Sequence, residues 1–191
     1  MKTLRPGAFA AAFMSFGLLA GCADDSTAPL APTSSSSPLP DLSGIYTLTI
    51  DRGSCDAAQQ FPDTVRTRTY VATVRQYGHE LRVDLEGAEF ANGLSHFGGY
   101  VRSADAMFEL NSGSVTPWDT SDPALPDVAE RLPDGFLSFS GSAIAMLVPG
   151  GLSGTLYGTF TIYEALAVGG GPVRSQCHSD AHRFALMRKA A

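Results

Sequence analysis

Hydrophobic and polar positions alternate with a period of two over most of this chain. In residues 44–50, Tyr46, Leu48 and Ile50 fall on one face and two threonines fall on the other. Such alternation is typical of a β-strand with one buried side and one side facing solvent. The pattern therefore predicts a first strand that turns these three large side chains toward a core.

The later segments repeat this pattern and are separated by short turns. Two β-hairpins are predicted, because each pair of alternating segments flanks a short polar or glycine-containing run. The first pairs 67–76 with 80–86 around Tyr77-Gly78-His79, and the second pairs 96–102 with 105–111 around Ser103-Ala104. Further strands are predicted over 135–148 and 152–165, joined through Pro149-Gly150-Gly151, and a final strand over 182–188.

About eight sequential strands with short connections predict an antiparallel all-β domain. We expect an up-and-down β-barrel of the lipocalin-like kind, because closure removes the exposed edges of a sheet. A β-sandwich is the alternative, since the number of strands does not separate the two. Residues 112–134 interrupt the alternation with four prolines and predict a long loop, in which 127–132 would form one helical turn.

The first 22 residues have the order of a secretory signal. Lys2 and Arg5 precede an apolar stretch, Ala8–Ala20, that is too short to span a bilayer. The run Leu19-Ala20-Gly21-Cys22 resembles the lipobox of bacterial lipoproteins. That resemblance implies cleavage before Cys22, lipid attachment to its sulfur, and a stable anchor in the cell envelope. In that family Ala23 favours the outer membrane, on its periplasmic face or at the cell surface.

The chain then divides into a tether and one domain. Residues 22–41 are rich in serine and proline and hold too few large apolar side chains to fold alone. We therefore expect a signal peptide over 1–21, a lipidated Cys22 with a disordered tether over 22–41, and a single barrel over 42–191 that contains the loop 112–134.

The net charge of the mature chain limits the classes of partner that it is expected to bind. Without Lys2 and Arg5, 11 basic residues remain against 19 acidic ones, a net charge of −8. A chain this acidic and without basic runs is not expected to bind nucleic acid, nor to bind anionic lipid headgroups electrostatically.

The lipobox also accounts for the odd number of cysteines. With Cys22 carrying lipid, Cys55 and Cys177 remain, and export to an oxidising compartment predicts a disulfide between them. The alternative, a metal or redox pair, lacks the C-x-x-C spacing. Cys55 follows the first predicted strand and Cys177 precedes the last, so the bond would join the two ends of the fold.

A second resemblance concerns the start of the domain. Gly44-Ile45-Tyr46 is similar to the G-x-W sequence that opens the first strand of lipocalins, with tyrosine at the tryptophan position. In that family a basic residue on the last strand covers the aromatic ring, which implies this role for Arg188 or Arg183.

Residues that could carry chemistry are few. His178, Asp180 and His182 would share one face of an extended strand and are weak candidate zinc ligands. The alternative places 177–181 in a loop that holds the disulfide. Acidic residues crowd the long loop without calcium-loop spacing and predict a solvated acidic surface: Asp119, Asp122, Asp127, Glu130 and Asp134. Trp118 in the same loop either contacts a partner or folds back onto the barrel.

The function predicted from these residues is not catalytic. No G-x-S-x-G elbow, triad or phosphate loop is present, so we expect no enzyme and no cofactor. The first hypothesis is a membrane-anchored barrel that binds a small apolar ligand, and its lining residues would be Tyr70, Phe108 and Phe160. The alternative is a structural or protein-interaction module of the cell envelope that presents the loop around Trp118. The third hypothesis is a metal-dependent enzyme with its site around His178 and His182.

Overall fold

The computed structural model describes residues 38–55, 61–110, 127–166 and 171–190. Within them the chain forms nine strands and one 3₁₀ helix. The strands are β1 (Gly44–Asp51), β2 (Thr67–Tyr77), β3 (Glu80–Glu86), β4 (Phe90–Val101), β5 (Asp105–Glu109), β6 (Val128–Leu132), β7 (Gly135–Val148), β8 (Gly151–Tyr163) and β9 (Val173–Arg188). The helix η1 (Asp63–Val65) lies between β1 and β2.

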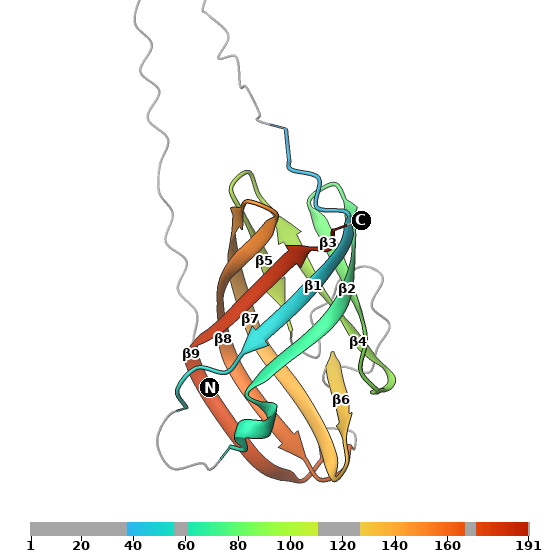
Figure 1. The fold of residues 1–191 in the computed structure, drawn as a ribbon, viewed down its shortest axis with the longest axis vertical. Helices are drawn as coiled ribbons and strands as arrows, with labels where there is room; N and C mark the ends of the chain where they lie inside the picture. Colours follow the sequence, from blue (N-terminus) through green and yellow to red (C-terminus); the bar gives the residue numbers. More distant parts are fainter. Residues whose placement is uncertain (1–37, 56–60, 111–126, 167–170, 191) are drawn as a thin grey trace, which may run out of the picture. The chain divides into compact units, whose positions relative to one another are not determined.

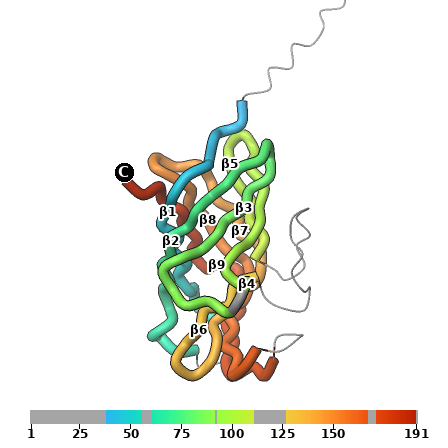
Figure 2. Tube along the Cα trace, turned by 90° about the vertical axis from the view of Figure 1, so that its right-hand side faces the viewer, coloured from blue at the N-terminus to red at the C-terminus, as the bar shows by residue number. Residues whose placement is uncertain are grey.

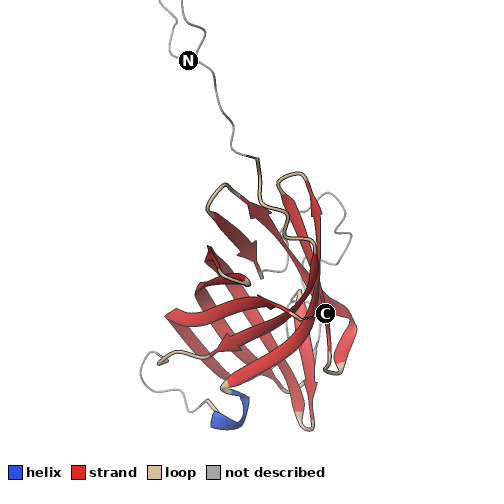
Figure 3. Cartoon of the chain, turned by 45° about the horizontal axis from the view of Figure 1, so that its top comes forward, coloured by secondary structure: helices blue, strands red, loops and turns tan. Residues whose placement is uncertain are grey.

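The strands close into an antiparallel up-and-down barrel (Figures 1 and 3). Each strand pairs with the next along the chain except β5 with β6, and β9 returns to pair with β1 through Tyr46–Arg188 to Asp51–Arg183. The ring has eight strand positions, and the predicted all-β barrel is confirmed. The alternative of two packed sheets is excluded, because the pairing runs unbroken around the ring.

One strand position is shared by β5 and β6. Both pair with β4 on one side and β7 on the other, β5 against residues 142–146 of β7 and β6 against residues 135–138 (Figure 1). Residues 127–132 were expected to form a helical turn in a loop, and this was wrong. The segment has period two: Val128, Glu130 and Leu132 face inward, and its backbone groups complete the sheet on both sides.

The two ends of the barrel differ in the segments that lie there. Residues 38–43 lead into β1 at the end formed by the β2–β3, β4–β5 and β7–β8 turns, where β9 also ends (Figure 2). We call this the tethered end, and the opposite one the far end. The far end carries η1 and the β3–β4, β6–β7 and β8–β9 connections.

The start of the domain is built as the sequence indicated. Tyr46, Leu48 and Ile50 are buried, and both predicted hairpins are present. The Arg188 guanidinium carbon lies 5.2 Å from the centre of the Tyr46 ring, and Arg188 donates a hydrogen bond of 3.0 Å to the Tyr46 hydroxyl. Of the two candidates for covering this ring, Arg188 makes the contact, whereas Arg183 pairs with Asp51 in the sheet.

The last strand is longer than predicted. It begins at Val173 rather than at His182, and it pairs with β8 from Tyr163–Val173 to Gly151–Met187. Only its carboxyl-terminal part also pairs with β1. Hydrophobic alternation is weak in residues 173–181, and this is why the sequence pattern missed this half of the strand. Cys177 consequently lies within the last strand, and the alternative of a loop over 177–181 is wrong.

Candidate functional site

The barrel interior was the predicted ligand site, and aromatic side chains occupy it. Near the middle of the barrel, Phe108 lies 5.1 Å from Phe184 and 5.9 Å from Phe97, measured between ring centres. Phe97 and Phe184 are 6.4 Å apart. Each of these rings is almost fully buried and meets the other two, so their mutual contacts fill this part of the interior.

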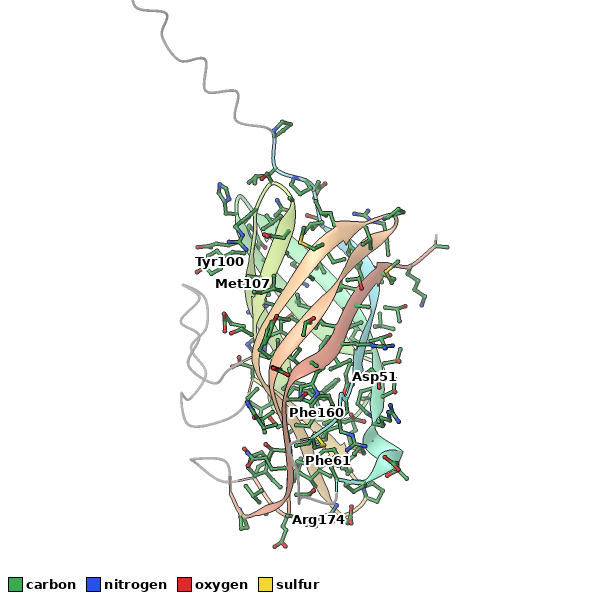
Figure 4. The ribbon with its side chains drawn as sticks, turned by 90° about the vertical axis from the view of Figure 1, so that its left-hand side faces the viewer. Asp51, Phe61, Tyr100, Met107, Phe160 and Arg174 are labelled. Carbon is green, nitrogen blue, oxygen red and sulfur yellow. A yellow bond between two sulfur atoms is a disulfide. The ribbon has the colours of Figure 1, made fainter. Side chains whose placement is uncertain are left out.

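A second aromatic group continues toward the far end. Phe160 lies 4.8 Å from Phe139 and 6.1 Å from Phe61, both edge to face (Figure 4). Tyr70 lies 6.2 Å from Phe139 and 5.5 Å from Phe90. The three residues expected to line a ligand site, Tyr70, Phe108 and Phe160, therefore point inward, and there they pack against other rings of this chain.

Both ends of the barrel contribute side chains to the same core. At the tethered end Leu42 is buried; its N–H donates to the Gln76 side chain at 2.8 Å, and its carbonyl accepts from the Tyr46 hydroxyl at 2.9 Å. At the far end Phe61 and Val65, on either side of the start of η1, are buried in the core. The segments that flank the strands thus cover the interior from both sides.

One charged cluster lies inside the barrel toward the far end. Arg68 on β2 forms a bidentate ion pair with Glu130 on β6, and the Tyr70 hydroxyl donates to the same carboxylate at 2.8 Å. Burial raises the pKa of Tyr70 well above its usual value, so the phenol stays protonated and serves as a donor. The arrangement compensates the buried charge of Glu130 and joins β2 to β6 across the barrel.

The predicted disulfide Cys55–Cys177 is present, with 5.0 Å between its Cα atoms. It connects the segment that follows β1 to the middle of β9. Arg52 lies beside it: its guanidinium contacts the Cys55 sulfur at 3.0 Å, pairs with Asp63 at 2.7 Å, and sits over the Phe61 ring. The bond therefore holds the segment after β1, together with the start of η1, against the far end of the barrel.

His182 is a fully buried part of this end of the core. Its Nδ1 accepts from the Gly53 N–H at 3.0 Å, which leaves the proton on Nε2 to donate to the Gly158 carbonyl at 3.2 Å. Gly53 must be a glycine, since a Cβ there would lie 2.6 Å from the Ala181 carbonyl oxygen. Burial lowers the pKa of His182, and His178 and Arg52 lower it further. The imidazole is thus a neutral structural bridge between three segments.

The three candidate zinc ligands do not converge. A register shift in β9 sets Leu156–His182 and Gly158–Ser179 as successive pairs, which puts an extra residue in this strand. The extra residue reverses the alternation, so that His182 points inward while His178 bonds Thr159 on the outer surface and Asp180 is exposed. The prediction of one shared face was wrong for this reason. Among the described residues, no three His, Cys, Asp or Glu side chains form a group that could hold a metal ion.

The expected acidic surface of residues 112–134 is also different. Glu130 and Asp127 are buried, and Asp134, in the turn that follows β6, forms a hydrogen-bonded ion pair with Arg174 on β9. This hydrogen bond lowers the pKa of Asp134. Asp119, Asp122 and Trp118 lie outside the described residues, as do Cys22 and the tether up to residue 37.

Sequence reasoning missed the charged cluster, although a signal for it was present. Arg68 has the same parity along β2 as Tyr70, Ala72 and Val74, which places it on the inward face. Glu130 has the same parity as Val128 along β6. Once 128–132 is taken as a strand, the two charges are both predicted to face inward, where a pair is the expected arrangement.

The outer surface of the barrel carries exposed apolar side chains, concentrated toward the tethered end. Tyr100 on β4 and Met107 on β5 are cross-strand neighbours on this outer face (Figure 4). On the β1–β9 wall of the tethered end a hollow of about 590 Å³ is lined by Ile45, Arg188, Lys189 and Ala190. A smaller hollow of about 340 Å³ lies at the far end, near Val65, Ile162 and Arg174.

Comparison with known proteins gives no relative. No family model, curated protein or solved structure matches the chain. The described part of the chain also holds no helix with the length and apolar character needed to cross a membrane. The geometry itself must therefore carry the functional argument: a barrel with an interior occupied by its own aromatic rings, and an uneven distribution of apolar groups on its surface.

Proposed function

We propose that this protein is a bacterial lipoprotein whose barrel serves as a structural or protein-interaction module of the cell envelope. The lipobox resemblance supports the anchor at Cys22, and the Ser/Pro-rich tether is suited to hold a folded domain near a membrane. The outer membrane is the location favoured by Ala23. The protein acts, in this proposal, through its surface rather than through its interior.

The packing of the interior is the observation that favours this function over the binding of an apolar ligand. Phe97, Phe108 and Phe184 contact one another, and Phe160 is enclosed by Phe139, Phe61 and His182. An eight-stranded barrel is just wide enough to be filled by its side chains or to hold one small ligand. These packed rings, together with Leu42 and Val65 that cover the two ends, favour the filled alternative.

The disulfide and the buried ion pair support the same proposal. Cys55–Cys177 joins segments 122 residues apart, and Arg68–Glu130 joins β2 to β6. A barrel that must open to admit a ligand would need mobile ends, whereas these two contacts hold the far end closed. Both contacts would stabilise a rigid scaffold that acts through its outer surface.

Intact-mass spectrometry tests both parts of the proposal on chain purified from membranes. The denatured mass reports covalent lipid on the chain that starts at Cys22, and a Cys22→Ser variant provides the matched control. The difference between the native and denatured masses reports any ligand bound without a covalent bond. We expect acyl mass on the wild type, none on Cys22→Ser, and equal native and denatured masses.

The two outcomes that contradict the proposal are separate. An uncleaved or unacylated wild-type chain would remove the lipid anchor. An apolar molecule that leaves on denaturation would instead establish the barrel as a carrier and return the function to Tyr70, Phe108 and Phe160.

A further inference from the structure

Exposed large apolar side chains gather at the tethered end of the barrel. We define the tethered rim as residues 38–46, 75–82, 99–107, 146–153 and 186–190, the parts of the strands and turns at that end. Of ten exposed large apolar residues in the described chain, seven belong to the rim: Ile45, Tyr77, Tyr100, Met146, Leu147, Val148 and Met187. Only Val173 lies near the far end. The barrel is therefore apolar at one end, the end from which the tether leaves.

The β7–β8 hairpin is the most prominent part of this rim. Leu147 and Val148 are consecutive and both exposed, so alternation has ended and both side chains face solvent. Met187 lies against the hairpin, since a Cβ added at Gly150 would be 3.7 Å from its Cε. The Arg188 N–H also donates to the Gly150 carbonyl at 2.7 Å. The hairpin tip and the end of β9 thus form one continuous surface.

The charge of the rim differs from that of the whole chain. The cationic side chains of the rim are Arg75, Arg82, Arg102, Arg188 and Lys189, and the anionic ones are Asp41, Glu80 and Asp105. These five and three groups give a net charge of +2, or +1 when Asp84 is included, which lies just beyond the rim and pairs with Arg75 and Arg82; the mature chain carries −8. Lys189 forms no ion pair with any described residue, and with Arg188 it lines the hollow beside Ile45. Basic side chains next to exposed apolar and aromatic ones are typical of a surface that meets a membrane interface.

We propose that the tethered rim docks on the lipid bilayer that holds the acylated Cys22, with the hairpin tip 147–148 in the interfacial region. This inference rests on the proposed lipid anchor. Residues 22–37 separate the anchor from the described domain, and a flexible chain of this length spans about 22 Å. The tether therefore keeps the rim, rather than the far end, within reach of the lipid surface at a high effective concentration.

We assign the bilayer as the partner of the rim because the tether leaves the barrel at this end. A protein partner or a second copy could approach the barrel from any side, and neither would need the apolar residues at the point of tether attachment. Apolar tips that insert, tyrosines at the headgroup level and basic side chains that reach phosphates each have a role at a lipid surface. Docking would orient the far end away from the membrane.

Two exposed valines at opposite ends provide a matched test. Val148 is 36% exposed and lies at the tethered rim, while Val173 is 53% exposed and lies at the far end. Each is replaced singly, Val148→Cys or Val173→Cys, in the full lipidated chain. The new thiol is labelled with a polarity-sensitive fluorophore, and the protein is reconstituted in vesicles that contain a quarter anionic lipid. Retention of the Cys55–Cys177 bond and of the β-sheet circular dichroism checks the fold.

We expect blue-shifted emission at position 148 that is quenched by spin-labelled lipid, and water-like, unquenched emission at position 173. The neighbouring substitution Leu147→Glu removes one large apolar side chain from the lipid interface. It is expected to weaken docking about tenfold and to reduce the quenching at 148 accordingly. Water-like emission at both positions would overturn the inference, and so would a blue shift at 148 that lipid quenchers do not reach.

Vesicle flotation separates this inference from the proposed anchor. A wild-type chain that floats with vesicles, and a Cys22→Ser chain that does not, uphold the anchor whatever the labels report. If the anchored chain floats and both labels stay in water, docking fails and the anchor stands. If the wild type does not float at all, the anchor fails and the docking that rests on it fails too.

Discussion

Removal of the Phe160 ring is the mutation that most directly probes the packed interior. Phe160 is fully buried on β8, and its ring contacts Phe139, Phe61 and His182 at centre distances of 4.8, 6.1 and 4.5 Å. In Phe160→Ala these three contacts are lost together, and no neighbouring ring can move into the space without leaving its own partners.

The expected loss follows from the transfer of the ring and from the cavity that remains. A buried phenylalanine replaced by alanine costs about 3–5 kcal/mol in the free energy of unfolding. In urea, with a slope near 2 kcal/mol per molar, the midpoint should fall by about 2 M. The assay is equilibrium unfolding of the mature chain carrying Cys22→Ser, followed by circular dichroism.

Tyr157→Ala serves as the control, since Tyr157 is an exposed aromatic residue three positions away on the same strand. Its loss should change the free energy of unfolding by less than about 1 kcal/mol. A cost below about 1.5 kcal/mol for Phe160→Ala would contradict a packed interior, because that is the behaviour of a side chain bordering open space in a hollow barrel.

Three further predictions concern the buried polar groups and the disulfide. Burial lowers the pKa of His182 below 6.5, so on acidification the unfolded chain takes up a proton at this group before the folded chain does. The free energy of unfolding should therefore decrease as the pH is lowered below about 6.5, by up to about 1.4 kcal/mol per pH unit, and this group should have no effect above that pH. His182→Gln should flatten that slope, whereas the exposed His178→Gln removes only a lesser cause of the lowered pKa and should change the slope much less; a slope unchanged by His182→Gln would contradict the assignment. Glu130→Ala leaves Arg68 and Tyr70 without their shared acceptor and should cost about 3 kcal/mol by urea unfolding, with a near-neutral result counting against the buried pair. Replacing both Cys55 and Cys177 by serine opens a loop of 122 residues and should cost about 4 kcal/mol, again by urea unfolding; a loss below about 1 kcal/mol would show that the disulfide does not constrain the unfolded chain.

The sequence pattern was sufficient where a strand has one buried and one solvated face. In β1 and β3 every second residue is large and apolar, and the burial in the structure follows that alternation. Glycine-containing runs between alternating segments marked the turns that join β2 to β3 and β7 to β8. These features are local, and local sequence therefore determines them.

The pattern failed where the structure depends on partners distant in the sequence. Residues 128–132 form a strand because β4 and β7 leave one position open below β5, and no property of this short segment shows that vacancy. The extra residue between Ser179 and His182 changes which side chains face inward, and a register shift leaves no signal in the alternation itself. This single extra residue places His182 on the opposite face of the strand from His178, so the candidate zinc ligands do not converge.

Side chains of this protein occupy the interior of the barrel, and in the proposed function the protein acts through its outer surface. Titration of the folded mature chain with a medium-chain fatty acid, followed by NMR of the phenylalanine side chains, tests it directly. We expect no saturable shift at Phe108, Phe160 or Phe184 in the wild type. Saturable one-to-one binding that shifts these interior rings would contradict it and would show that the barrel is a ligand carrier.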